Sequence, residues 1–178
     1  MRLNPDDEAL PVMVPRNDKA LVGMSANRVQ RLRSHLVSLM TRMKADATGS
    51  PPRPAPEGFA ARVARTACSL CRGWCCRNGA DDAFLDEPTL AHAGLTLSDA
   101  EAVMQYYLGR VPTVSYQDSC IFHAERGCTL DPSMRSDVCN AYFCGGLHAY
   151  IRGDDAVSPV VVIAGERDKM RRSSVLMP

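Results

Sequence analysis

Apolar residues recur at steps of three and four after Ser25, and this period predicts an amphipathic helix over residues 25–47. Ser25 suits the N-cap position, because its hydroxyl can accept a hydrogen bond from an amide of the first turn. The expected apolar face consists of Val29, Leu32, Leu36, Leu39, Met40 and Met43. Most basic side chains fall elsewhere on the helix: Arg28, Arg31, Arg33, Arg42 and Lys44.

Two interpretations of this helix stay open. Its basic and apolar faces suit docking on a protein partner or on a membrane surface. Alternatively, the helix packs on its own domain or on a second copy of the chain, with its arginines in solvent. The second interpretation is favoured, because helices of this kind are common as ordinary surface elements of globular proteins.

The pattern predicts further short helices downstream. Residues 59–67 form a helical period that leads into the first cysteines. Asp86 precedes a segment with Pro88 in its first turn, a position at which a helix tolerates proline. Residues 134–142 are also expected to be helical.

A separate helix is expected to open at Thr96 or Ser98 and to end at Gly109. Its acidic first turn is favourable for the helix dipole. Its expected buried face, with Tyr107 beside it, consists of Leu97, Ala100, Met104 and Leu108.

The expected β-structure is minor. The segment from Cys120 to Leu130 reads as two short strands or as a loop closed by Gly127. The segments 147–152 and 159–164 predict a β-hairpin with a longer loop. The fold class is therefore predicted as mainly α with a minor β-hairpin, in a small domain stabilised by metal–thiolate bonds and preceded by an N-terminal helical extension.

Proline and charge divide the chain into five predicted parts. Residues 1–24 carry three prolines and read as an extended arm, which the helix 25–47 follows. The segment 48–58 has four prolines among its eleven residues and reads as a stiff linker. It leads to a cysteine-cluster domain over 59–165 and a basic tail over 166–178. The tail is expected to be mobile or to contact another chain.

Composition excludes several functional classes. The net charge is only +1, whereas general binding to nucleic acid requires a strong basic excess. No apolar run approaches the roughly 20 residues that span a bilayer. The first residues are acidic and lack the apolar stretch of a secretory signal, so a cytoplasmic location is expected. In a reducing cytoplasm, cysteines are better explained as metal ligands than as disulfides.

The chemistry of the chain is concentrated in eight cysteines. The first four follow the spacing C-x2-C-x3-C-C, and the other four follow C-x7-C-x10-C-x4-C. The predicted ligands are Cys68, Cys71, Cys75, Cys76, Cys120, Cys128, Cys139 and Cys144. Gly73 and Trp74 suit a tight turn within the first group. Because Cys75 and Cys76 are adjacent, their side chains tend to point apart, and the first four do not necessarily share one site.

Several soft centres fit thiolate ligands. An iron–sulfur cluster needs thiolates on a protected apolar surface, and aromatic residues lie beside several of the cysteines. A closed zinc site would act as a structural staple. Copper(I) is a third option, and some cysteines can instead be buried small hydrophobes. His123 and His148 are more often structural in this setting, whereas Arg135 can bond a cluster sulfide, a carboxylate or a backbone carbonyl.

The full pattern resembles the YkgJ-type cysteine-cluster family. The resemblance runs from Cys68 to Cys144 and includes all eight cysteines, Gly127 and Arg135. Where that family often has Arg-Pro and Cys-Arg, this chain has Arg135-Ser136 and Cys139-Asn140. The family is described as a zinc- or iron-chelating module. A similar module occurs in flagellin lysine N-methylases, where the resemblance implies an iron–sulfur cluster.

The sequence therefore predicts a protein that holds an iron–sulfur cluster, preferably [4Fe–4S], or zinc ions. Arg135 is the candidate contact to the cofactor, and a redox or protein-modification role is one expectation. The alternative is a structural zinc module that acts as an interaction subunit through its N-terminal helix and C-terminal tail. A third class is an enzyme that works at the metal. No phosphate-binding loop or hydrolase motif is visible.

Overall fold

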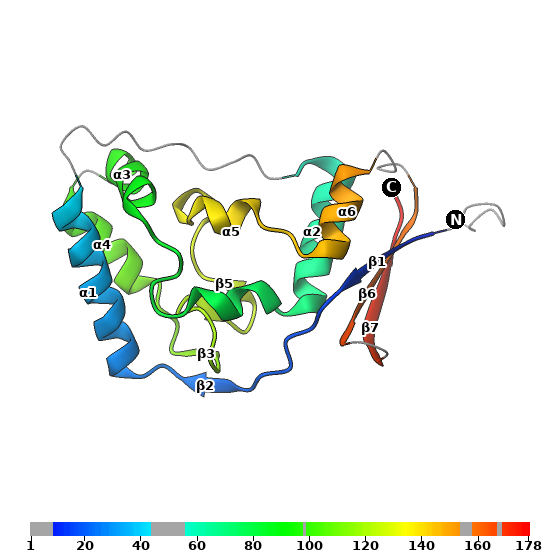
Figure 1. The fold of residues 1–178 in the computed structure, drawn as a ribbon, viewed down its shortest axis with the longest axis horizontal. Coiled ribbons are helices and arrows are strands. Elements are labelled where there is room, and N and C mark those ends of the chain that lie inside the picture. The colour runs from blue at the N-terminus through cyan, green and yellow to red at the C-terminus, as the bar shows by residue number, and fades with distance from the viewer. Residues whose placement is uncertain (1–8, 44–55, 98, 154–157, 167–168) are drawn as a thin grey trace. The chain divides into compact units, whose positions relative to one another are not determined.

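The structure is a computed structural model of the 178-residue chain (Figure 1). It describes residues 9–43, 56–97, 99–153, 158–166 and 169–178. About 49% of the chain is helical and 18% is strand, which confirms the predicted class of mainly α with minor β.

The chain forms two compact units. Unit 1 comprises Met1–Asp18, Ala55–Trp74 and Phe143–Pro178. Unit 2 comprises Lys19–Pro54 and Cys75–Tyr142. The boundaries after Trp74 and Tyr142 fall inside the range 59–165, which the sequence predicts as one domain.

In its described residues, unit 1 is a three-stranded sheet with two helices. Its elements are β1 (Leu10–Val14), α2 (Gly58–Cys71), α6 (Gly145–Arg152), β6 (Val160–Glu166) and β7 (Lys169–Leu176). The strand order is β1-β6-β7, with β1 parallel to β6 and β7 antiparallel to β6. The sheet thus joins the start of the described chain to its end (Figure 1).

The core of unit 1 follows from alternation along the strands. Val12 and Val14 are buried, whereas Met13 between them is 52% exposed, because successive side chains of a strand point to opposite faces. Helices α2 and α6 pack on the buried face. The residues of β6 on that face are fully buried: Val160, Val162 and Ala164.

The first turn of α6 lies directly on the backbone of β1. A Cβ atom at Gly146 would stand 1.9 Å from the carbonyl oxygen of Met13, far closer than van der Waals contact. A Cβ at Gly145, one residue earlier, would meet nothing within 4 Å. Only glycine therefore permits this approach at position 146.

Unit 2 is mostly helical. Its helices are α1 (Ala26–Arg42), α3 (Glu87–Thr96), α4 (Ala100–Gly109) and α5 (Asp137–Ala141). Two 3₁₀ helices accompany them: η1 (Trp74–Gly79), whose first residue belongs to unit 1, and η2 (Pro132–Met134). The short strands are β2 (Leu21–Gly23), β3 (Val114–Tyr116), β4 (His123–Ala124) and β5 (Gly127–Cys128). They form two antiparallel pairs, β2 with β3 and β4 with β5.

Helix α1 confirms the expected cap and apolar stripe. The Ser25 side chain accepts a hydrogen bond from the Arg28 amide, and the helix begins at Ala26. Its buried residues are Leu32, Leu36 and Leu39. The helix contacts α3 and α4, so it packs on its own domain as favoured. The rest of its predicted range beyond Met43, like most of the linker 48–58, lies outside the described residues.

Helices α3 and α4 begin at aspartate caps. Asp86 caps α3 by accepting a hydrogen bond from the Thr89 amide, and Asp99 caps α4 in the same way. The prediction that α4 opens at Thr96 or Ser98 is wrong, because Asp99 lies where its carboxylate meets the first free amides. The predicted buried face is right in part, because Leu97, Met104 and Leu108 are half-buried against the core. Ala100, however, is exposed, and the fully buried residues are Val103 and Tyr107.

Replacing Tyr107 with phenylalanine is expected to destabilise unit 2 by about 1–2 kcal/mol. The Tyr107 side chain is fully buried, and its hydroxyl donates to the Met134 carbonyl at 2.9 Å. Without the hydroxyl, this buried acceptor loses its hydrogen bond from Tyr107. Urea unfolding followed by circular dichroism measures the change. The control is Tyr106→Phe, whose hydroxyl meets the exposed Asp131 carboxylate, and it should cost less than about 0.5 kcal/mol. Equal costs would contradict the prediction.

Two other predictions need correction at the C-terminal end. The predicted hairpin of 147–152 with 159–164 is wrong, because 147–152 belongs to helix α6, where Leu147 and Tyr150 lie one turn apart and are buried. Strand β6 instead pairs with β1 and with the tail, which forms β7 rather than a mobile segment. The arm 1–24 likewise contributes the paired strands β1 and β2.

The remaining elements are close to expectation. Of the two alternatives for the segment after Cys120, two short strands are confirmed as β4 and β5. The helix expected over 59–67 extends to Cys71. The helix expected over 134–142 is shorter, because Ser136 caps α5.

Candidate functional site

The eight cysteines divide between the two units. Unit 2 holds five of them, and we call these the unit 2 cysteines: Cys75, Cys76, Cys120, Cys128 and Cys139. Unit 1 holds the other three, the unit 1 cysteines: Cys68, Cys71 and Cys144. The sequence predicts all eight as ligands but does not predict this division.

Backbone hydrogen bonds join two of the segments that carry the unit 2 cysteines. Cys75 and Cys76 lie on η1, and the Cys76 carbonyl accepts a 2.8 Å hydrogen bond from the Cys120 amide. The next amide, that of Ile121, donates at 2.8 Å to the Ala80 carbonyl. These two bonds hold the segment after β3 against the turn that follows η1.

Gly79 makes this approach possible. A Cβ atom there would lie 2.9 Å from the Cys120 Cβ and 3.3 Å from its sulfur. Sequence reasoning missed this role of Gly79. Its one sequence signal is a glycine three residues after Cys76, and spacing alone does not say what approaches it.

The turn after η1 is strained. Ala80, Ala83 and Phe84 have φ angles of 40°, 54° and 57°, in the left-handed region that is unfavourable for residues with a side chain. Such residues cost about 1–3 kcal/mol each and persist only where surrounding contacts hold them. The turn therefore depends on its hydrogen bonds to the rest of unit 2.

Cys139 and Arg135 belong to a later part of the chain, and Cys139 reaches the turn after η1. Cys139 lies on α5, and its sulfur is 4.0 Å from the Ala83 carbonyl oxygen. Although the residue is exposed, its thiol faces protein atoms, and this loss of solvent raises its pKa to about 11. The Arg135 guanidinium donates twice to the Leu130 carbonyl, at 2.9 and 2.7 Å. Of its three predicted partners, Arg135 thus binds a backbone carbonyl.

The unit 2 cysteines influence one another electrostatically. The side chains of Cys75 and Cys76 do not point apart as expected. A hydrogen bond between their thiols lowers the pKa of Cys75 to about 7 and raises the pKa of Cys76. The charges of Cys120 and Cys128 raise the pKa of Cys76 further. Burial raises the pKa of Cys120 to about 12, with smaller contributions from Cys128 and Cys139. The thiols of Cys76, Cys120 and Cys139 therefore resist ionisation, and the charges of neighbouring cysteines add to this resistance.

The unit 2 cysteines lie close together but are not arranged as a metal site. Within the described ranges, no group of three or more His, Cys, Asp or Glu side chains is arranged to hold a metal ion. The thiols are near enough to affect each other's charge, and their sulfurs have not converged on one point.

The unit 1 cysteines lie at helix ends. Cys68 and Cys71 occupy the last turn of α2, and Cys144 is the N-cap residue of α6. The Cys71 sulfur accepts a 3.3 Å hydrogen bond from the Trp74 amide. Arg72, at φ 54°, and Gly73, at φ 65°, form the turn between them, which agrees with the tight backbone predicted at Gly73.

His123 is a packed histidine of unit 2. It is 1% exposed, its Nδ1 lies 2.7 Å from the Ser119 hydroxyl, and its ring centroid is 4.6 Å from that of Tyr116. These contacts agree with the structural interpretation of this residue. Because Ser119 precedes Cys120, the histidine also supports the segment that carries this cysteine.

Comparisons with protein-family models, curated proteins and solved structures found no match for this chain. The resemblance to the YkgJ-type family accordingly stays a prediction based on cysteine spacing. Among the described helices, none combines the length and apolar character needed to cross a membrane.

Proposed function

We propose that unit 2 binds a soft metal centre through thiolates of the unit 2 cysteines. The observation that carries this proposal is that four segments of unit 2, each with at least one thiol, lie close together. They are η1, strand β5, helix α5 and the segment that follows β3. Thiolate selects zinc, copper(I) or iron–sulfur clusters over hard cations. Five thiols exceed the four that a tetrahedral zinc ion or a [4Fe–4S] cluster requires.

The chemistry of the donors fits a cation. Partly buried thiols resist ionising together, because their negative charges repel one another. A bound metal ion would balance these charges and stabilise the thiolates, and binding would release protons. The region is protected on one side, since Ile121 and Phe122, next to Cys120, are fully buried. Convergence of the sulfurs on one centre is the step that metal binding would drive, because metal affinity and local folding are coupled.

An iron–sulfur cluster is the preferred centre. The cysteine spacing that resembles the YkgJ-type family and the apolar residues beside the cysteines both support it. With such a cluster, a redox or protein-modification role in the cytoplasm follows as the proposed activity. The alternative is a closed zinc site that stabilises an interaction subunit. The unit 1 cysteines stay predicted ligands, and the site in unit 2 does not depend on them.

Anaerobic purification and elemental analysis test the proposal. An iron–sulfur protein should be brown, absorb near ~400 nm and lose this absorbance on oxidation. Colourless protein with stoichiometric zinc would support the structural alternative. Protein that contains neither metal, and binds neither Zn²⁺ nor reconstituted iron and sulfide, would contradict the proposal.

A further inference from the structure

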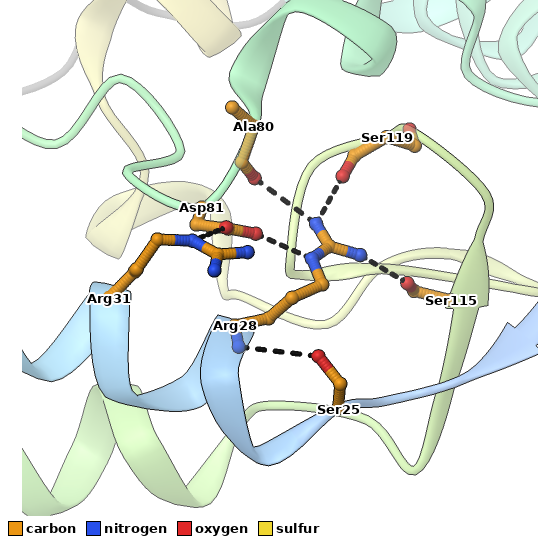
Figure 2. A network of polar contacts seen from close by, with 7 residues as sticks. All are labelled: Ser25, Arg28, Arg31, Ala80, Asp81, Ser115 and Ser119. Atoms are coloured by element: carbon orange, nitrogen blue, oxygen red, sulfur yellow. Dashed lines mark hydrogen bonds and ion pairs between the residues drawn. The ribbon is translucent and has the colours of Figure 1, made fainter.

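Arg28 connects helix α1 to the turn of Ala80 and Asp81 and to the segment that carries Ser115 and Ser119 (Figure 2). Its guanidinium donates to the Asp81 carboxylate and, at 3.0 Å, to the Ser115 hydroxyl. It also donates to the Ser119 carbonyl and, at 3.5 Å, more weakly to the Ala80 carbonyl. The Arg28 side chain is only 17% exposed, so most of this network is shielded from water.

The bond to Ser119 acts on the peptide group that leads into Cys120. The carbonyl of this group accepts from Arg28, and its N–H, which belongs to Cys120, donates to the Cys76 carbonyl at 2.8 Å. Because a peptide group is planar, holding both ends fixes its orientation. The position of the Cys120 Cα is thereby restrained from the preceding side.

The bond to Asp81 acts on the strained turn. Asp81 follows Ala80, whose φ is 40°, and its carboxylate accepts hydrogen bonds from both Arg28 and Arg31. The Ala80 carbonyl in turn receives the Ile121 amide at 2.8 Å. A single guanidinium therefore holds the turn after Cys76 and the segment of Cys120 in one arrangement.

We propose that Arg28 is a positioning residue for the metal centre of unit 2, which sets the distance and direction between the Cys76 and Cys120 thiols. This inference rests on the proposed function. It assigns a role in the site to helix α1, which lies outside the cysteine-containing part of the chain. Lysine cannot substitute, because one ammonium group cannot present the planar fork that meets a carboxylate, a hydroxyl and a carbonyl together.

The test compares Arg28→Met with Arg42→Met. Both residues lie on α1 and both donate to a carboxylate, but the described partners of Arg42 are Glu87 and Ser38, which lie outside the cysteine segments. Affinity for Zn²⁺ is measured on metal-free protein by competition with a coloured chelator. Arg28→Met is expected to bind about tenfold to a hundredfold more weakly, as for the loss of other groups that orient metal ligands. Arg42→Met should bind like the original protein.

Iodoacetamide labelling of the same metal-free proteins, read by mass spectrometry, supplies a second readout. Arg28→Met is expected to raise the labelling rate of Cys120, which is 8% exposed, several-fold relative to that of Cys128. A general loss of structure would raise both rates together and would contradict a positioning role. If the Arg28 variant fails to fold, Asp81→Asn removes the shared charge and keeps an acceptor, and the same selective rise is expected.

The two proposals fail in different ways. If the original protein binds no metal, the proposed function fails, and the labelling rates alone decide whether Arg28 positions Cys120. If the original protein binds Zn²⁺ and Arg28→Met matches it in affinity and in Cys120 labelling, the role of Arg28 is overturned while the metal site stands.

Discussion

Cys120→Ser is expected to weaken metal binding by roughly a hundredfold. Structural zinc sites contribute about 10–16 kcal/mol in total, so the loss of one of four thiolates should cost about 3 kcal/mol. Cys120 is the most buried of the unit 2 cysteines, and its amide already ties it to Cys76. Serine keeps the size and leaves a hydroxyl, which is a poor ligand for a soft metal. Competition titration with Zn²⁺, or cluster content after anaerobic reconstitution, measures the change.

The control must separate ligand loss from a damaged core. Ala93→Ser places a hydroxyl at a fully buried position of the same hydrophobic core, on α3, without removing a sulfur. It is expected to lower stability and to leave metal affinity within about threefold of the original, because the ligand set is intact. Equal metal binding by Cys120→Ser and the unsubstituted protein would remove Cys120 from the site.

Gly146→Ala is expected to destabilise unit 1 by about 3 kcal/mol, at the upper end of the usual cost of overpacking. The added methyl would stand 1.9 Å from the Met13 carbonyl oxygen, and a backbone atom cannot rotate away as a side chain does. Helix α6 must then move off β1 and expose part of the core that includes Leu147 and Val12. Urea unfolding followed by the fluorescence of Trp74, the single tryptophan and a member of unit 1, measures the loss.

Gly145→Ala provides the matched control. It makes the same chemical change one residue earlier in α6, where a Cβ meets nothing within 4 Å. Alanine favours helix over glycine by about 0.8–1 kcal/mol, so this variant should be as stable as the original or slightly more stable. If the two variants unfold at the same urea concentration, the close approach of α6 to β1 is not as described.

Local signals explain which elements were predictable. The apolar period of α1 and its Ser25 cap act within a few residues, and the structure confirms both. The predicted cap of α4 is wrong, because several consecutive polar residues can act as the N-cap. The packing of Tyr107 decides which face of the helix is buried. The prediction of a strand over 147–152 is wrong because a short apolar segment fits both a strand and a helix, and its packing on β1 selects the helix.

The candidate ligands could be named from the sequence, but their arrangement could not. Cysteine spacing identifies the candidate ligands, and the turn at Gly73 follows from local backbone preference. Gly79 and Arg28 carried no comparable signal. Each acts through a partner about 40 to 90 residues away in the chain, Cys120 for the glycine and Ser119 for the arginine.

By itself, the sequence determined the apolar period and the Ser25 cap of α1, and a set of eight thiols of a kind that favours soft metals. Only the tertiary structure decided that five thiols belong to unit 2, that the C-terminal tail completes a sheet with β1 and β6, and that Arg28 meets the segment of Cys120. The physical reason is the separation along the chain over which each interaction acts. Caps and periods depend on neighbours in the chain, whereas strand pairing, close backbone approach and buried ion pairs depend on which distant segments folding brings together.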